Sequence, residues 1–131
     1  MKYMVLMQGP KGNWQEFTTT PVKDIKAHVA FMVELNRELA ASGELVDSQG
    51  LAFPDDAKIV CARPNGAPAV TDGPFPEAKE FLAGYWIVDV EDEARAIAIA
   101  ARVSTAPGRD GVPLNFPVQV RQVMCAPPVE L

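Results

Sequence analysis

Residues 70–88 read VTDGPFPEAKEFLAGYWIV and contain a sharp turn followed by an apolar strand. In the turn, Asp72 can accept hydrogen bonds from backbone N–H groups just ahead of it, Gly73 tolerates unusual backbone angles, and Pro74 fixes φ. Residues 81–88 are apolar at odd and even positions alike, which indicates a strand covered on both faces. This stretch therefore predicts a stiff corner that holds a carboxylate and leads into a central strand.

Two helices are predicted from the spacing of apolar residues. The first spans residues 21–42, with Thr20 as its capping residue and Gly43 at its end. The second spans about residues 90–103, with Asp89 as its cap and acidic residues in its first turn, where the helix dipole favours anions. The side chains expected to face the sheet are Ile25, Val29, Met32, Leu35 and Leu39 on the first helix and Val90, Ala94, Ile97, Ala98 and Ala101 on the second.

Strands on either side of these helices complete the order of elements. Residues 9–20 are polar and rich in Gly, Pro and Thr, so we expect a loop there. The turn signal Pro64-Asn65-Gly66 favours a hairpin in which the stretch at 68–71 pairs with the strand before it. The other expected strands are residues 2–8, 44–53, 56–63, 81–88 and 118–124. The order β-α-β-β-α-β predicts an α+β fold of the ferredoxin-like split βαβ type.

One face of this predicted sheet lacks a cover. Two helices can cover only one face of such a sheet, yet residues 2–8 and 81–88 are apolar on both faces. A chain of 131 residues suits a single domain and has nothing left to cover the second face. A second copy packed sheet against sheet, with twofold symmetry, would bury that face, so we expect a homodimer.

Composition limits the partners of the chain. Hydrophobic residues make up 48% and charged residues 22%, as in an ordinary soluble globular protein. The formal net charge of −5 and the lack of a basic cluster argue against a nucleic-acid partner. No apolar run approaches the about 20 residues that a membrane helix needs, and the features of a signal peptide are missing from the first residues. We therefore expect a cytoplasmic protein with no membrane partner.

Neither cysteine belongs to a metal-binding motif. Cys61 and Cys125 lie far apart without zinc spacing, and Cys61, in a strand-like run, is expected to be a small buried side chain. A single histidine excludes a multi-histidine metal centre within one chain, although a carboxylate site with one histidine stays open. The sequence has no phosphate loop, dinucleotide fingerprint or Ser-His-Asp order. We predict no metal and no cofactor.

His28 is the main candidate for chemistry. It lies between Ile25 and Met32 on the apolar stripe of the first predicted helix, so we expect it to face the sheet. One interpretation is a core histidine that makes a single hydrogen bond. The other is a general acid or base whose tautomer and pKa are tuned by a carboxylate. Asp72 is the carboxylate for the second interpretation, although an Asp before Gly-Pro is also a common turn former.

Three further side chains are candidates for binding a ligand. Lys79 can form the positive wall of an anion site, or it can belong to a solvated charged group with its glutamate neighbours. Tyr85 and Trp86 project from opposite faces of a strand, so one should pack under the helices while the other faces away from them. A phenol on the far face can donate to a ligand or simply pack. Arg121, on the last strand, is either an anion clamp or a surface arginine.

The stretch that follows Thr71 resembles the signature of the YCII-related family. That signature reads roughly Thr-Asp-Gly-Pro-Phe-Ala-Glu-Thr-Lys-Glu, followed by Gly-Gly-Tyr. The chain departs from it at Pro76, Ala78 and Ala83. Nine residues match at fixed spacing, namely Asp72, Gly73, Pro74, Phe75, Glu77, Lys79, Glu80, Gly84 and Tyr85.

The resemblance implies a fold and a candidate site. It extends over nearly the whole chain and implies that residues 1–131 form a single YCII-related domain, which assembles into a dimeric α/β barrel. In that family the proposed active-site pair is a histidine on the first helix and the aspartate of the Asp-Gly-Pro-Phe turn, which correspond to His28 and Asp72. Members of the family commonly occur alongside alternative sigma factors, so the resemblance also implies a regulatory role as an alternative.

Two functions from different classes follow. The first is a small cofactor-independent enzyme in which His28 and Asp72 move a proton in a small molecule, by isomerisation, elimination or hydrolysis. The second is a non-catalytic homodimer that senses a small ligand or binds a partner, including a partner in sigma-factor regulation. An enzyme needs a cavity that reaches both residues, whereas a binding protein needs an exposed apolar patch outside the dimer contact.

Overall fold

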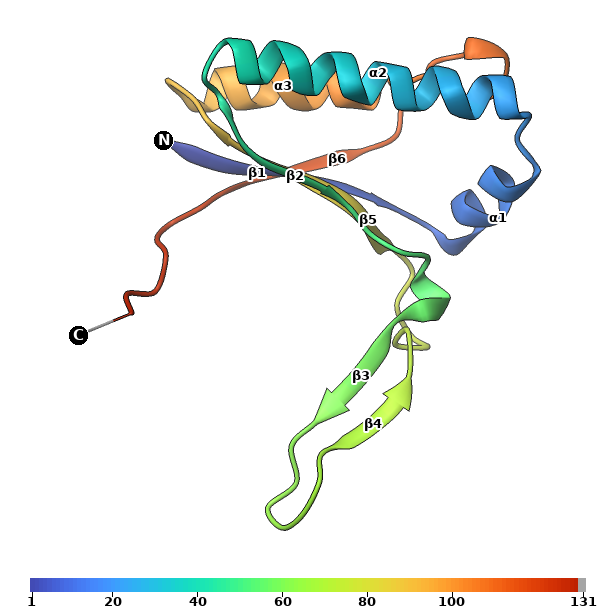
Figure 1. The fold of residues 1–131 in the computed structure, drawn as a ribbon, viewed down its shortest axis with the longest axis vertical. Helices are drawn as coiled ribbons and strands as arrows, with labels where there is room; N and C mark the ends of the chain where they lie inside the picture. Colours follow the sequence, from blue (N-terminus) through green and yellow to red (C-terminus); the bar gives the residue numbers. More distant parts are fainter. Residues whose placement is uncertain (130–131) are drawn as a thin grey trace.

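The centre of the molecule is an antiparallel sheet of four strands in the order β2-β5-β1-β6 (Figure 1). The computed structural model describes residues 1–129. Its sheet strands are β1 (Lys2–Gly9), β2 (Leu45–Gly50), β5 (Phe81–Asp89) and β6 (Val118–Gln122). The two segments that are apolar at odd and even positions, β1 and β5, take the central places in the sheet. Together with the helices, this sheet confirms the predicted α+β class.

Two long helices, α2 (Val22–Ala41) and α3 (Glu93–Ser104), lie side by side over one face of the sheet (Figure 1). Both match predicted helices. They enclose one core with that sheet face, and burying each large apolar side chain there contributes about 1.5–3 kcal/mol. The most buried members of this core include Leu35, Leu39, Ile99 and Val103 from the helices and Tyr3, Val5, Trp86 and Val88 from the sheet.

The polar segment after β1 was expected to be a loop, but it contains a third helix, α1 (Lys11–Thr19), so that prediction is wrong. Contacts with distant residues support this short helix. Trp14 packs edge-on against Phe81 with ring centroids 6.3 Å apart. Glu16 accepts a hydrogen bond from Arg109 at 3.1 Å. Short helices depend on such packing rather than on local propensity, which explains why the sequence pattern did not indicate this one.

The start of α3 differs from the prediction. Asp92 is the N-cap, and its carboxylate accepts a hydrogen bond from the backbone N–H of Arg95 at 2.9 Å. Asp89, the predicted cap, instead accepts a hydrogen bond from the amino group of Met1 at 3.0 Å. Both aspartates lie before the apolar residues of the helix, so the sequence pattern does not choose between them. Only the aspartate directly before the first helical turn can reach the free N–H groups of that turn.

Most of the predicted buried stripe of α3 is also wrong: Val90, just before the helix, is buried as predicted, whereas the four predicted residues within the helix are exposed. Ile97, expected to face the sheet, is 54% exposed. Alanines recur along this segment, so the apolar pattern fits more than one helical phase and cannot decide between them. The helix residues that are buried are Ala96, Ile99, Ala100 and Val103.

For α2, the predicted capping residue and part of the predicted buried stripe are also wrong. Thr20 does not cap α2, because its hydroxyl donates to the carbonyl of Glu16 in the preceding helix at 2.9 Å. Pro21 occupies the N-cap position and makes no side-chain cap. Val29, placed on the buried stripe from its spacing, is 51% exposed, whereas Leu35 is 1% exposed. The C-terminal half of the helix therefore packs as expected, while its N-terminal half lies nearer the edge of the core.

A hairpin made of β3 (Lys58–Cys61) and β4 (Ala69–Asp72) projects from the sheet on the side away from the helices (Figure 1). The pairing of these strands was predicted. Val60 and Val70 are cross-strand partners and are 60% and 58% exposed. Cys61 is exposed as well, so its predicted burial is wrong, because the hairpin lies outside the core.

In the described part of the chain, α2 and α3 cover one face of the sheet, and no helix lies over the other face (Figure 1). Met4 and Leu6 alternate with the core residue Val5 and therefore project to this face, where Met4 is half-buried and Leu6 is only 8% exposed. Met4 pairs with Ile87 across the strands. No helix among residues 1–129 is long and apolar enough to cross a membrane. Two short 3-10 turns, η1 (Pro54–Asp56) and η2 (Arg109–Gly111), lie in the connections.

Candidate functional site

The turn Asp72-Gly73-Pro74, which we call the signature turn, ends β4 at the base of the hairpin and leads toward β5. The N–H of Gly73 donates to the carbonyl of Ala57 at 2.8 Å, which ties the turn to the opposite strand. Asp72 is the cross-strand partner of Lys58 and accepts a hydrogen bond from its ammonium group. The Asp72 side chain is 84% exposed, so this ion pair adds little to stability. Asp72 therefore lies in water, opposite a lysine.

His28 lies on α2, the first long helix, and its one hydrogen bond indicates which ring nitrogen carries the proton. Its Nδ1 lies 3.0 Å from the carbonyl oxygen of Pro107. A carbonyl can only accept, so Nδ1 carries the proton and Nε2 of the neutral ring offers a lone pair. The ring also packs edge-on against Phe17, with centroids 6.0 Å apart. Among the described residues, Nε2 has no hydrogen-bond partner.

The two residues predicted as a catalytic pair have different partners. His28 donates to Pro107, while Asp72 pairs with Lys58. No hydrogen bond or ion pair links His28 to Asp72 within residues 1–129. Neither residue lines either of the two hollows described below. The pairing of these two residues stays a prediction.

Two of the predicted ligand-binding residues project to the face away from the helices. Tyr85 is the neighbour of the core residue Trp86 on β5 and, as predicted, points to the opposite face. Arg121 of β6 is the cross-strand partner of Met4 of β1, so its side chain also projects to the face away from the helices. Lys79 is exposed in the segment between the signature turn and β5. The structure therefore places Tyr85 and Arg121 on one surface and Lys79 outside it.

Asp47, which the sequence analysis did not single out, is the acidic group at this surface. Its Oδ2 accepts a hydrogen bond from the Tyr85 hydroxyl at 3.1 Å. Its Oδ1 accepts from the N–H of Ser48 at 2.9 Å and from the Gln49 amide at 3.0 Å. The hydrogen bond to Asp47 raises the pKa of Tyr85 above its usual value, and burial adds to the effect. An aspartate inside a predicted strand, where the residue is unusual, was the available signal.

A hollow of about 320 Å³ adjoins the signature turn. It lies between the segment that follows β2, the turn itself and the start of β5. We call it the signature hollow, and it is mostly apolar. Its lining residues are Leu51, Ala52, Phe53, Pro54, Asp56, Ala57, Pro74, Phe81 and Leu82.

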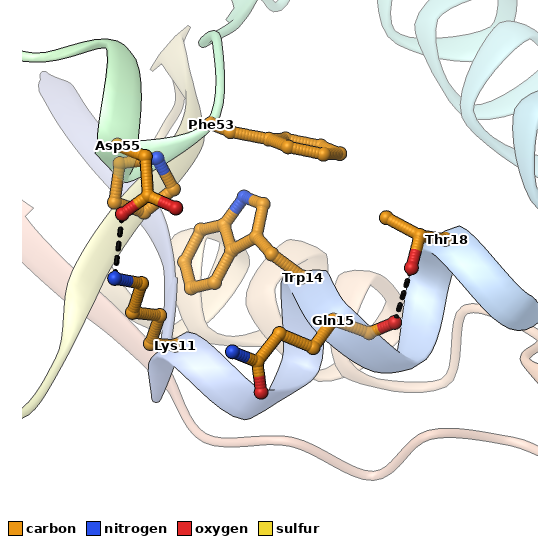
Figure 2. A pocket seen from close by; sticks show the side chains of 7 residues that line it. Lys11, Trp14, Gln15, Thr18, Phe53 and Asp55 are labelled. Atoms are coloured by element: carbon orange, nitrogen blue, oxygen red, sulfur yellow. Dashed lines mark hydrogen bonds and ion pairs between the residues drawn. The ribbon is translucent and has the colours of Figure 1, made fainter.

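A second, smaller hollow of about 150 Å³ lies on the α1 side of Phe53. Trp14 and Thr18 of α1 form one wall, and Phe53 stands across from Trp14 (Figure 2). At its rim, the Lys11 ammonium lies 2.5 Å from an Asp55 carboxylate oxygen. We call this space the aromatic slot. It and the signature hollow share the wall formed by Phe53 and its neighbour Pro54.

A polar chain crosses the helix-covered face of the sheet. The indole N–H of Trp86 donates to Asn36 Oδ1 at 2.7 Å, and the Asn36 amide donates to the Ser48 hydroxyl at 3.3 Å. The partners of Asn36 are therefore the side chains of Trp86 and Ser48 rather than a backbone carbonyl. Since a buried indole N–H needs an acceptor, Asn36 has a structural role rather than a role in ligand binding.

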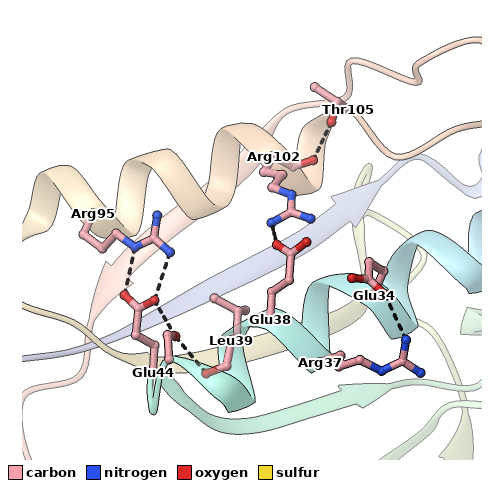
Figure 3. A network of polar contacts seen from close by, with 9 residues as sticks. Glu34, Arg37, Glu38, Leu39, Glu44, Arg95, Arg102 and Thr105 are labelled. Atoms are coloured by element: carbon pink, nitrogen blue, oxygen red, sulfur yellow. Dashed lines mark hydrogen bonds and ion pairs between the residues drawn. The ribbon is translucent and has the colours of Figure 1, made fainter.

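Ion pairs join α2 and its C-terminal loop to α3 (Figure 3). Arg95 forms a two-pronged pair with Glu44, with nitrogen–oxygen distances of 2.8 and 2.9 Å. These hydrogen bonds lower the pKa of Glu44 to about 2 from its usual 4.5. Arg102 binds Glu38 further along the helices. The pairs hold the helix layer together and lie away from both hollows. Residues 1–129 contain no cluster of three side chains that could hold a metal ion.

Comparison with known proteins identifies one family. The family description that matches is the YCII-related domain, and the match extends over residues 1–113. This range includes the sheet strands up to β5, all three helices and the signature turn. No curated protein matches the chain.

Proposed function

The chain belongs to the YCII-related domain family, and we propose that it acts as a homodimer that binds a small, largely apolar molecule beside the signature turn. The observation that carries this proposal is the signature hollow. Its volume of about 320 Å³ falls within the roughly 300–1,000 Å³ of typical small-molecule sites. The family signature provides one wall through Pro74, and β5 provides another through Phe81 and Leu82.

The lining of the hollow favours one kind of ligand. Apolar side chains make up most of the wall, and Asp56 is the one charged residue among those that line it. A ligand with an apolar body and a single hydrogen-bond donor matches this arrangement. Asp72 and Lys58 lie next to the hollow and neutralise one another. The proposal therefore assigns the signature turn a role in shaping a binding site rather than in supplying a catalytic carboxylate.

Dimerisation is part of the proposal, because no helix among residues 1–129 covers the sheet face away from α2 and α3, and the hairpin valines are exposed. The strand order is that of a ferredoxin-like sheet, and a second copy packed on the free face would form a dimeric α/β barrel. An isolated two-stranded hairpin is marginally stable by itself. Val60 and Val70, both about 60% exposed, are the side chains with which the hairpin would contact the other copy.

A second candidate function, proton transfer by His28, is favoured by one observation. Since Nδ1 donates to Pro107, the lone pair of the neutral ring is at Nε2, which has no hydrogen-bond partner among residues 1–129 and can accept a proton. A pairing with Asp72, as the family resemblance implies, would require the Lys58–Asp72 pair to open. If the Asp72→Asn variant and the wild type show the same dependence of reaction rate on pH, Asp72 takes no part in this candidate mechanism.

The binding proposal is tested by filling the signature hollow. Ala52 is exposed and lines the hollow, so Ala52→Trp should occupy it without disturbing the core. The matched control is Ala27→Trp on the exposed side of α2. A set of small primary amides with apolar bodies is titrated by two-dimensional NMR. We expect saturable shifts around Leu82 in the wild type and in the control, and their loss in Ala52→Trp. Equal binding by Ala52→Trp, or no binding by the wild type, would contradict the proposal.

A further inference from the structure

The sheet face away from the helices carries opposite charges at its two edges. In the strand order β2-β5-β1-β6, Asp47 of β2 is the cross-strand partner of Ile87, which is the partner of Met4. Met4 is in turn the partner of Arg121 on β6. These four residues form one row across the sheet. The row is therefore acidic at the β2 edge, apolar in the middle and basic at the β6 edge.

Neither charge of this row has an ion-pair partner within residues 1–129. Asp47 is half-buried, and the groups that donate to its carboxylate are neutral: the Tyr85 hydroxyl, the Ser48 N–H and the Gln49 amide. Arg121 is exposed. Neighbouring strands lie about 4.8 Å apart, so three strand spacings separate the two residues by about 14 Å. Asp47 and Arg121 of one chain therefore lie too far apart to pair with each other.

Twofold symmetry offers two ways to pack this face on a second copy. If the axis runs along the strands, between β5 and β1, then β2 of one copy lies over β6 of its partner. If the axis runs across the strands, β2 lies over β2 and β6 lies over β6. Only the first axis brings Asp47 over the partner's Arg121, and it does so at both edges because the two residues share a row. Since like charges in contact weaken an interface, the charge pattern selects this axis.

Other residues of the same face agree with the axis along the strands. It places Met4 over the partner's Ile87, which brings apolar side chains together at the centre of the interface. Lys2 and Asp89 are also cross-strand partners on β1 and β5, so the axis places Asp89 over the partner's Lys2. Packed sheets lie about 10 Å apart, a gap that a long arginine side chain and an aspartate can bridge together.

We propose that the twofold axis of the dimer runs along the strands of the central sheet, so that Asp47 of each copy forms an ion pair with the partner's Arg121 at the edges of an apolar interface. This inference rests on the dimer of the proposed function and adds which residues meet in it. The Tyr85 hydroxyl, 3.1 Å from Asp47 Oδ2, holds the carboxylate in place for this contact.

Reversing the charge of Arg121 tests the pair. Arg121→Asp would set two aspartates against each other at both edges, so self-association should weaken about a hundredfold. The matched control is Arg37→Asp, which changes the net charge equally on the exposed side of α2, away from the sheet. It should associate within about threefold of the wild type. Sedimentation at several concentrations measures the dissociation constants, and urea unfolding of the dissociated chains checks that each variant folds.

The dependence on residue 47 identifies the partner of Arg121. Asp47→Asn removes the charge and keeps an oxygen that can accept from Tyr85. In this background Arg121→Asp creates no like-charged contact, so it should weaken association by no more than about threefold. An equal effect of Arg121→Asp in both backgrounds, or no larger effect than that of Arg37→Asp, would overturn the pair and leave the dimer standing. A monomeric wild type would overturn the dimer and the pair together.

Discussion

The two faces of the central sheet differ in how their apolar side chains are covered and in which hydrogen bonds their polar groups make. On the face under α2 and α3, apolar side chains are buried, and the Trp86 indole has its acceptor in Asn36. On the other face, no helix of the described residues covers Met4 and Ile87, and Tyr85 donates a hydrogen bond to Asp47. The same strands supply both faces. The helix-covered face therefore holds the core of one chain, and the other face is where we propose that a second copy packs.

The largest effect is expected where the helix-covered face is most tightly packed. Leu35 is 1% exposed, and Leu35→Ala should destabilise the chain by about 2–5 kcal/mol, because it removes apolar contacts and leaves a cavity. Val29 on the same helix is 51% exposed, and Val29→Ala should change stability by less than about 0.5 kcal/mol. Urea denaturation measures both. Similar losses for the two variants would contradict the assigned core.

The polar chain under the helices should give the next largest effect. Asn36→Ala leaves the buried indole N–H of Trp86 without an acceptor, which should cost about 1–3 kcal/mol. In Trp86→Phe no such donor exists, so adding Asn36→Ala to that background should cost clearly less. A double-mutant cycle by chemical denaturation measures the difference. Additive losses would show that the two side chains do not depend on each other.

The hairpin should matter for association rather than for the core. Val60→Lys places a charge on the exposed valine pair and should weaken self-association about tenfold, which corresponds to about 1.4 kcal/mol. The unfolding free energy of the dissociated chain should stay within about 0.5 kcal/mol of the wild type. The control is Val33→Lys on the exposed side of α2. Sedimentation at several concentrations reports the dissociation constants, and an equal effect of both variants would contradict a role for the hairpin.

The ion pair between the helices should give the smallest effect, and its pH dependence has a defined sign. The folded-state pKa of Glu44 is about 2, below its usual 4.5, so this pair stabilises the fold above about pH 4.5 and loses its contribution as pH falls toward 2. Because the Arg95 side chain is 47% exposed, we expect at most about 1 kcal/mol. Glu44→Gln should therefore flatten the stability curve in this window. Parallel curves for the two proteins would refute the assignment.

Much of the fold could be predicted because its strands carry strong signals. Residues 2–8 and 81–88 are apolar on both faces, and they form the two central strands. The helix α1 could not be predicted in this way, because its support comes from distant residues such as Phe81 and Arg109. Likewise, the alanines of α3 do not define a single buried face.

The candidate site was predicted less completely. The alternation along β5 correctly separated Tyr85 from Trp86. The contribution of Asp47 depends on a strand pairing with an irregular register between Leu45 and Asp47, which no local pattern reveals. The two hollows are also formed by segments far apart in the sequence, such as Trp14 and Phe53. Non-local contacts of this kind cannot be obtained from periodicity or turn signals.

The mass of the particle in solution tests the central claim most directly, because the free face and the hairpin are proposed to contact a second copy. One chain has a mass of 14.2 kDa. Light scattering at micromolar concentration should give twice that mass, and dilution should lower it as the dimer dissociates. A mass of one chain throughout the micromolar range would contradict the claim that the free sheet face and the hairpin pack against another copy.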